Sequence, residues 1–425
     1  MKIENEKNNV KKSKLLIYLI IYKVVIELIY VLVINPLYGY TKLNLEMNFI
    51  KAIESYLLLI ILVIFFPKNK NYPSFSLYFI LSIFIYIPLG SYMWLADQSS
   101  LYYIFVVISF IIIAGIIKIK KINLKSNFHA SLSIFNLIYI VYFIVTIYLI
   151  VIRGGIDLRA ISLDEIYSLR SEQDINGLNG YLLNWSAKVF CPFFIAFYLY
   201  KKNYLLVFLT MALQMIMFLS YGYKAYLFSI IMLVFVLSST RKDNFEKKFS
   251  QGITYTIIIS YLMYILFSST TLINTIAFRL IYVPVQIQYQ YFDYFNKFEK
   301  MNFSQNIIGK ILNIEDNFNQ PISFVISMYY QGVISNSNTG VFSDAFANGG
   351  FTLMLIYSIL IGAIFYLIDV LTNKIPLKYT VASLSYLMFV LNDNSLLTSL
   401  LTGGLALMIL LLFLFNTHIR KNEEI

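Results

Sequence analysis

Long apolar stretches alternate with short polar segments along almost the whole chain. The apolar stretches lie near residues 15–34, 50–66, 74–94, 101–117, 132–152, 181–200, 204–220, 224–239, 252–272, 350–372, 379–391 and 396–416. A helix of about 20 apolar residues crosses the hydrocarbon core of a membrane. The pattern therefore predicts an all-α polytopic membrane protein with about 12 transmembrane helices.

The composition excludes a water-soluble fold. Hydrophobic residues make up 59% of the 425 positions, charged residues only 13%, and the mean hydropathy is +0.72. Soluble domains carry about a quarter charged residues, which cover their surface. Cys191 is the only cysteine, so an intrachain disulfide is excluded.

The basic charge follows the predicted topology. With the N-terminus in the cytoplasm, 21 of the 33 Lys and Arg residues fall in the short cytoplasmic segments. This bias is the positive-inside rule, and it predicts that both termini are cytoplasmic. The net charge of +11 therefore reports orientation, and we expect no nucleic-acid partner.

Two outer segments, 153–180 and 273–349, are long within what we expect to be a single integral membrane domain covering residues 1–425. Segments of this length are usually functional or disordered. Apolar residues recur at helical spacing through 276–295 and 303–330, which predicts short helices lying on or in the outer leaflet. Residues 203–240 must cross the membrane and return, so the hairpin tip at residues 220–224 is expected at the outer surface.

Three basic residues of the outer side are candidates for binding phosphate. Arg279 stands alone in an aromatic segment; it fits a phosphate bidentately, or it anchors the chain in lipid headgroups. Pro284 is expected to break or kink this helix. Lys224 at the hairpin tip needs a partner or a water-filled cavity, and Arg170 is either functional or a surface charge balanced by Glu172 and Asp174.

Polar residues that flank the last spans form a second set. Asp344 and Asn348 are four residues apart before the tenth span and are expected to share a helix face. The alternative is an N-terminal cap with a polar rim. The pair Asn392 and Asp393 is expected to occupy a tight outer turn, where it would cap the twelfth helix.

Several chemistries lack their residues. Both histidines, His129 and His418, fall in segments expected to be cytoplasmic, so no outer metal site and no outer histidine base are predicted. The sequence has no P-loop and no dinucleotide-binding glycine motif. Acidic residues deep in the spans are scarce: Glu27 lies within the first and Asp369 near the cytoplasmic end of the tenth. This scarcity disfavours a proton-coupled transporter.

Three motifs resemble one known family. The segments RLIYVPVQIQYQYFDYF (279–295), NTGVFSDAFANGGF (338–351) and LNDNSLLTSLLTGGL (391–405), in this order, are similar to the Wzy-type polymerases of O-antigen and capsular oligosaccharide repeat units. The twelve-span plan with a late, long outer loop is also similar. Related O-antigen ligases share the architecture but use a histidine in the large outer loop, which has none here, so the resemblance favours a polymerase.

The resemblance implies a GT-C-like, metal-independent membrane glycosyltransferase without a cofactor. The growing glycan would pass from undecaprenyl pyrophosphate to the non-reducing sugar of a new lipid-linked repeat, on the outer face of the inner or plasma membrane. Arg279, Lys224 and Arg170 would stabilise the departing pyrophosphate. Asp344, or failing that Glu172, would accept the hydroxyl proton.

Further residues are expected to bind the sugars and their carrier. The candidate substrate-binding residues are Tyr223, Tyr282, Asn338, Thr339, Asn348 and Asp393. The expected partners are the undecaprenyl-pyrophosphate-linked donor and acceptor, membrane lipids and a chain-length regulator. A flippase for lipid-linked oligosaccharide is the competing class, although its polar residues should line a cavity in both halves rather than gather on the outer side.

Overall fold

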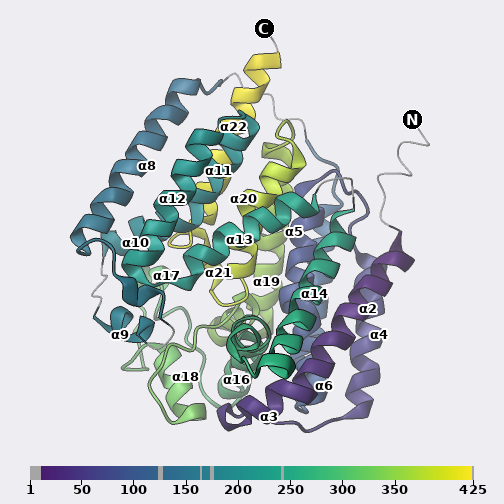
Figure 1. Cartoon of the computed structure of the whole chain (residues 1–425). Coiled ribbons are helices and arrows are strands. Elements are labelled where there is room, and N and C mark those ends of the chain that lie inside the picture. The colour runs from purple at the N-terminus through teal and green to yellow at the C-terminus, as the bar shows by residue number, and fades with distance from the viewer. Residues whose placement is uncertain (1–10, 123–127, 163–164, 173–176, 241–243, 424–425) are drawn as a thin grey trace. The chain divides into compact units, whose positions relative to one another are not determined.

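The computed structural model describes residues 11–122, 128–162, 165–172, 177–240 and 244–423, and most of these residues are helical (Figure 1). Within this described part, nine helices are long and apolar enough to cross a membrane: Lys12–Thr41, Pro73–Leu95, Ser100–Ile117, Leu132–Ile152, Leu178–Tyr200, Tyr204–Tyr221, Phe245–Phe267, Val341–Leu371 and Leu396–Arg420. Lys224–Ser239 and Leu377–Val390 are shorter apolar helices. The helices confirm a polytopic membrane protein, whereas the count of twelve spans, their orientation and the GT-C-like architecture stay predictions.

The helices group into two compact units, each assembled from separate stretches of the chain. Unit 1 comprises residues 1–120, 243–366 and 389–397. Its elements are α2 (Lys12–Ile29), η1 (Tyr30–Ile34), α3 (Asn35–Tyr38), η2 (Gly39–Thr41), α4 (Phe49–Phe65), α5 (Pro73–Leu81), η3 (Ser82–Tyr86), α6 (Ile87–Leu95), α7 (Ser100–Ile117), α14 (Phe245–Phe267), α15 (Thr271–Ile273), η6 (Asn274–Tyr282), α16 (Val283–Lys297), α17 (Ile307–Leu312), α18 (Ile322–Gln331) and most of α19 (Val341–Leu371). Helices α2, α4, α6 and α14 pack side by side (Figure 1).

Unit 2 comprises residues 121–242, 367–388 and 398–425. Its elements are α8 (Leu132–Ile152), η4 (Leu158–Ala160), α9 (Ile166–Ser171), α10 (Leu178–Trp185), η5 (Ser186–Phe190), α11 (Cys191–Tyr200), α12 (Tyr204–Tyr221), α13 (Lys224–Ser239), most of α20 (Leu377–Val390), the end of α21 (Leu396–Leu400) and α22 (Leu405–Glu423). Helix α12 packs against α8, α11 and α13. The predicted hairpin of residues 203–240 is confirmed, with Gly222 ending α12 in the left-handed conformation.

Four prolines inside helices share one local geometry. Pro36, Pro88, Pro192 and Pro284 each follow a π-helical segment that ends two residues earlier. Proline lacks an N–H group, and its ring clashes with the carbonyl four residues before it. The wider π turn moves that carbonyl aside, so the helix continues. Pro284 therefore marks a change from π-helix to α-helix and does not break the helix, whereas the expected alternative of a kink stays a prediction.

The carbonyls that two of these prolines leave unpaired accept hydrogen bonds from neighbouring helices. In a π-helix, Pro88 would have bonded the Ile83 carbonyl and Pro192 the Ala187 carbonyl. The Tyr22 hydroxyl donates to Ile83 O at 3.1 Å, and Gln214 Nε2 donates to Ala187 O at 3.0 Å. Freed backbone groups within a membrane must find such partners. Two sequence-distant polar side chains are therefore explained by prolines on other helices.

Candidate functional site

Helix α16 is a buried helix of unit 1 that carries polar side chains. The hydroxyls of Tyr289 and Tyr291 donate to Leu89 O and Ser337 O at 3.2 and 3.0 Å. Gln286 Nε2 donates to Thr41 O at 2.8 Å, and the Tyr282 hydroxyl to Ile26 O at 2.7 Å. The helix predicted over 276–295 is confirmed, and α16 is buried, with its glutamines and tyrosines bonded to backbone carbonyls of neighbouring segments. Its place on or in the outer leaflet stays a prediction.

The buried amide of Gln288 joins α16 to the turn after α20. Gln288 Nε2 donates to Asn392 Oδ1 at 2.9 Å, and the Tyr102 hydroxyl donates to Gln288 Oε1 at 3.3 Å. Asn392 is fully buried. We therefore correct the expectation that it caps the twelfth helix: its side chain bonds α16 instead.

The start of α19 packs against Gln288 and Asn392. A Cβ atom on Gly340 would lie 2.6 Å from Asn392 O and 3.2 Å from Gln288 Cδ, so only glycine fits there. Ser343 Oγ lies 2.6 Å from Thr339 Oγ1 and donates to Gly340 O at 3.1 Å. Tyr102, Gln288, Gly340, Ser343 and Asn392 are called the α16–α19 cluster below.

Asp344 and Asn348 follow this cluster on the first turns of α19. Asn348 Nδ2 donates to Asp344 O at 2.9 Å and to Asp344 Oδ1 at 3.2 Å, which confirms that the two residues share a helix face. Asn348 Oδ1 accepts the Phe303 N–H at 2.9 Å. The helix is kinked directly after this pair, because Gly349 and Gly350 leave helical geometry and Gly350 has φ +65°. The kink separates a polar rim from the apolar remainder of α19.

Lys300 lies beside this kink and was not identified from the sequence. Its ammonium group lies 3.5 Å from the centre of the Phe346 ring and donates to Phe295 O at 2.7 Å. Burial lowers the pKa of Lys300 to about 8. In the described part of the chain it forms no ion pair, whereas nearby Lys297 pairs with Asp293 at 2.7 Å. In the sequence, the only feature that could have pointed to Lys300 is that, unlike Lys297, it has no carboxylate four residues away.

In unit 2, Arg170 holds the turn between α12 and α13. Its Nε donates to Gly222 O at 3.0 Å, and its guanidinium carbon lies 5.3 Å from the centre of the Tyr223 ring. Gly222 has φ +68°, and a Cβ atom there would meet Ile166 and Leu169 of α9. Arg170 therefore fixes the hairpin tip to α9.

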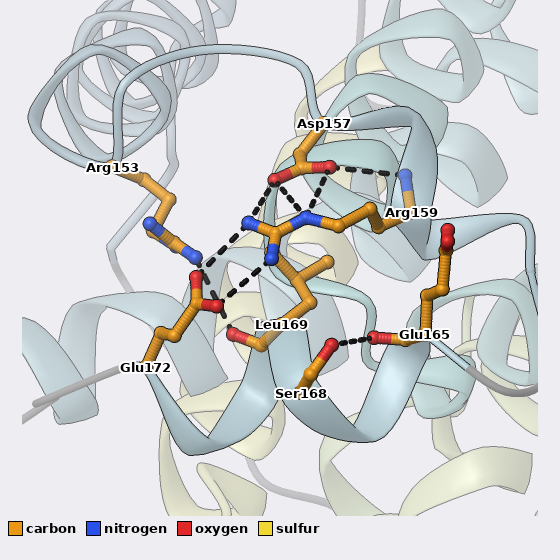
Figure 2. A network of polar contacts seen from close by, with 7 residues as sticks. All are labelled: Arg153, Asp157, Arg159, Glu165, Ser168, Leu169 and Glu172. Atoms are coloured by element: carbon orange, nitrogen blue, oxygen red, sulfur yellow. Dashed lines mark hydrogen bonds and ion pairs between the residues drawn. The ribbon is translucent and has the colours of Figure 1, made fainter.

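Glu172 belongs to an arginine-centred network, shown in Figure 2. Arg159 donates from both terminal nitrogens to the two Glu172 oxygens, at 2.8 and 2.9 Å, and its Nη2 donates to Asp157 Oδ2 at 2.8 Å. These bonds lower the pKa of Glu172 below its ordinary value. Glu172 thus pairs with Arg159, and not with Arg170 as the surface-charge alternative predicted. Asp174, the other predicted partner of Arg170, lies outside the described residues.

A cavity of about 280 Å³ lies beside the hairpin tip in unit 2. It is lined by Gly180, Leu183, Asn184, Lys188, Tyr223, Ala225 and Tyr226. The candidate Lys224 is the first residue of α13 and is half-buried next to two of these lining residues. Lys188 was missed because its mid-span charge is averaged away in a hydropathy window.

The remaining candidates occupy varied settings. Arg279 is exposed on η6, where its neighbour Phe278 stacks on Tyr38 at 4.0 Å. Asn338 is exposed, and Asp393 is half-buried in the turn after α20. The structure thus groups Arg279, Thr339, Asp344, Asn348 and Asp393 in unit 1, and Arg170, Glu172, Tyr223 and Lys224 in unit 2.

Among the described residues, no group of three or more His, Cys, Asp and Glu side chains is placed to hold a metal ion, and metal independence stays a prediction. No model of a known protein family, no curated protein and no solved structure matches this chain.

Proposed function

We propose that this protein polymerises lipid-linked oligosaccharide repeat units into a surface polysaccharide. The donor is a growing glycan on undecaprenyl pyrophosphate, and the acceptor is one lipid-linked repeat. The acceptor hydroxyl oxygen attacks the anomeric carbon, the bond from that carbon to the phosphate oxygen breaks, and undecaprenyl pyrophosphate leaves with the bonding electrons. The hydroxyl proton passes to a carboxylate.

The observation that carries the proposal is the α16–α19 cluster. It joins α16, the start of α19 and the turn after α20, which contain the three motifs that resemble the polymerase family. These motifs are separated by tens to about a hundred residues in the chain, yet Gln288, Gly340 and Asn392 are in direct contact. A polar centre among apolar helices is costly unless it has a function or a full set of partners.

The geometry favours Asp344 over Glu172 as the proton acceptor. Both Glu172 oxygens are occupied by Arg159, which lowers the pKa of this carboxyl and makes it a weaker base. Asp344 accepts one hydrogen bond from Asn348, a neutral amide, and lies at the polar rim of α19. A pyrophosphate leaving group requires cations rather than a general acid. Arg279, Arg170 and Lys224 keep this role in the proposal, and Lys300 is added to them.

The proposal is tested by reconstitution. Purified protein in liposomes is given the lipid-linked repeat of its own host, and products are separated by size. We expect a ladder of polymers on the lipid carrier, with release of undecaprenyl pyrophosphate. A protein that leaves the repeats unjoined but moves them across the liposome membrane would be a flippase, and one that transfers glycan only to a different final acceptor would be a ligase.

The α16–α19 cluster has a matched pair of glycine variants. In Gly340→Ala the new methyl group would meet Asn392 O, whereas a Cβ on Gly115 of α7 has no heavy atom within 4 Å. We expect loss of polymer in cells with Gly340→Ala and normal polymer with Gly115→Ala, at equal protein levels. Normal polymer with Gly340→Ala would show that polymer formation does not depend on the α16–α19 cluster.

A further inference from the structure

Lys188 is a lysine near the middle of a candidate membrane span. The span covers Leu178–Tyr200, and Lys188 lies in its π-helical segment η5. An ionisable side chain at this depth is costly, and such residues face the protein interior or a water-filled cavity. Local π-helical segments within α-helices also occur frequently at functional sites.

The cavity beside Lys188 presents polar groups from two helices. Gly180, Leu183, Asn184 and Lys188 recur at helical spacing, so they occupy one face of α10 and η5. Tyr223, Ala225 and Tyr226 come from the first turn of α13 and the residue before it. Trp185 of the same helix is used for packing, since its Nε1 donates to Leu401 O at 3.0 Å. The lining therefore combines one cation with an amide and two tyrosines.

Among the described residues, cations act on one of the tyrosines that line the cavity. Burial raises the pKa of Tyr223, and the charged groups that act on it are Arg170 and Arg153, both cations. Lys224 is adjacent to it in the chain. Of the carboxylates that the structure describes in this region, Asp157 and Glu172 are both bound by Arg159, and Glu165 is the third (Figure 2); Asp164 and Asp174 lie outside the described residues. An anion is the ligand that this surrounding charge would attract.

We propose that this cavity binds the phosphate group of a membrane-anchored lipid, with Lys188 as the cation that contacts it. The volume of about 280 Å³ is slightly below that of pockets for drug-sized ligands, so it accommodates a phosphorylated headgroup rather than a whole oligosaccharide. The source is a lipid rather than free phosphate because the cavity is built from helices of membrane-spanning character. The identification of the lipid as undecaprenyl pyrophosphate rests on the proposed function, whereas binding of a lipid phosphate does not.

Binding of farnesyl pyrophosphate, a short prenyl pyrophosphate, tests the proposal. The full-length protein in phosphatidylcholine nanodiscs is titrated with farnesyl pyrophosphate, farnesol or inorganic pyrophosphate, and Kd is measured by native mass spectrometry. We expect tightest binding of farnesyl pyrophosphate. Lys188→Met, which keeps the length and removes the charge, should weaken it by at least about tenfold, since a hydrogen bond to a charged group is lost.

Two further variants make the outcome specific. Ala225→Phe fills the cavity from α13 without changing charge, and it should also weaken binding. Lys201→Met removes a lysine at the end of α11, outside the cavity, and should leave binding unchanged. Unchanged affinity in Lys188→Met and Ala225→Phe would overturn the proposal, and equal binding of farnesol or of inorganic pyrophosphate would overturn the phosphate or the lipid part. The assay involves no glycan transfer, so tight binding without polymer formation would refute only the proposed function.

Discussion

Gln214 on α12 provides a quantitative test of how this protein accommodates its prolines. Its Nε2 atom donates to Ala187 O at 3.0 Å, Tyr226 O at 3.2 Å and Ser229 Oγ at 3.3 Å. The side chain is fully buried. It therefore ties α12 to both helices that line the Lys188 cavity, and Gln214→Leu should loosen them.

The size of the effect follows from the groups left unpaired. In Gln214→Leu, Ala187 O keeps only Ser229 Oγ at 3.5 Å, which is a weak contact. A buried carbonyl without a partner costs about 1–3 kcal/mol. Gln214 Oε1 is itself buried without a partner among the described residues, so its removal offsets part of that cost. We expect a net destabilisation of about 1–2 kcal/mol.

The proline makes the prediction specific. Pro192→Ala restores an N–H group that can donate to Ala187 O in the π geometry. The cost of Gln214→Leu should then fall by about 1 kcal/mol in the Pro192→Ala background, which is a measurable coupling energy. Equilibrium unfolding of the four proteins by sodium dodecyl sulfate in mixed micelles, followed by circular dichroism, gives the cycle.

The control is Gln251→Leu, which removes a partly exposed glutamine of α14 and should show no coupling to Pro192. A cost of Gln214→Leu that is the same with proline and with alanine at position 192 would contradict the pairing of Gln214 with the carbonyl that Pro192 frees. It would mean that Gln214 contributes through packing alone and that the freed carbonyl is not its reason for being there.

Four further predictions concern the candidate site. If the guanidinium of Arg279 binds phosphate bidentately, both Arg279→Lys and Arg279→Ala should lower the polymerisation rate by roughly 10²–10³, and near-normal polymer with lysine would indicate headgroup anchoring instead. Asp344→Asn should lower the rate by about 10²–10⁴ with normal protein levels, and unchanged transfer in the liposome assay would exclude it as the base. Gly222→Ala should destabilise unit 2 by more than about 1 kcal/mol, and by more than Gly332→Ala, because both have positive φ but only Gly222 has neighbours in contact with the added methyl group; equal unfolding midpoints would contradict this. The pKa of Lys300 is lowered to about 8, so the unfolded chain binds more protons above that pH and stability should rise from pH 8 towards 10 relative to Lys300→Met, whereas a parallel pH dependence of the two proteins would argue against its burial.

Hydrophobic periodicity located the helices because the apolar stretches are long and their polar breaks are short. It could not place α16, whose alternating Gln and Tyr residues suit a membrane surface and a polar interior equally well. Only the tertiary contacts, such as Gln288 with Asn392, distinguish the two. The contact between Lys300 and Phe346 joins residues 46 positions apart, and no local pattern predicts such a pair.

Sequence spacing likewise predicted some contacts of the candidate site residues and not others. The Asp344 and Asn348 pair was accessible from sequence because its spacing matches one helical turn. The arginine that pairs with Glu172 could not be identified from sequence. Arg153, Arg159 and Arg170 are all within about 20 residues of Glu172, and spacing alone cannot choose among them. The turn at η4 brings Arg159 to it, and that turn depends on the Asp157 carboxylate, which accepts the Arg159 N–H at 3.0 Å.

The way unit 1 is assembled has a consequence for biogenesis. Its first helix, α2, packs against α14, which leaves the ribosome more than 200 residues later, and Asn392 comes later still. The early helices therefore enter the bilayer before their partners in unit 1 are synthesised. Within α2, Lys23 and Glu27 form an ion pair of 2.6 Å. An internal pair four residues apart forms as soon as its own helix does. It allows the translocon to release a span that carries two charges long before the rest of its unit exists.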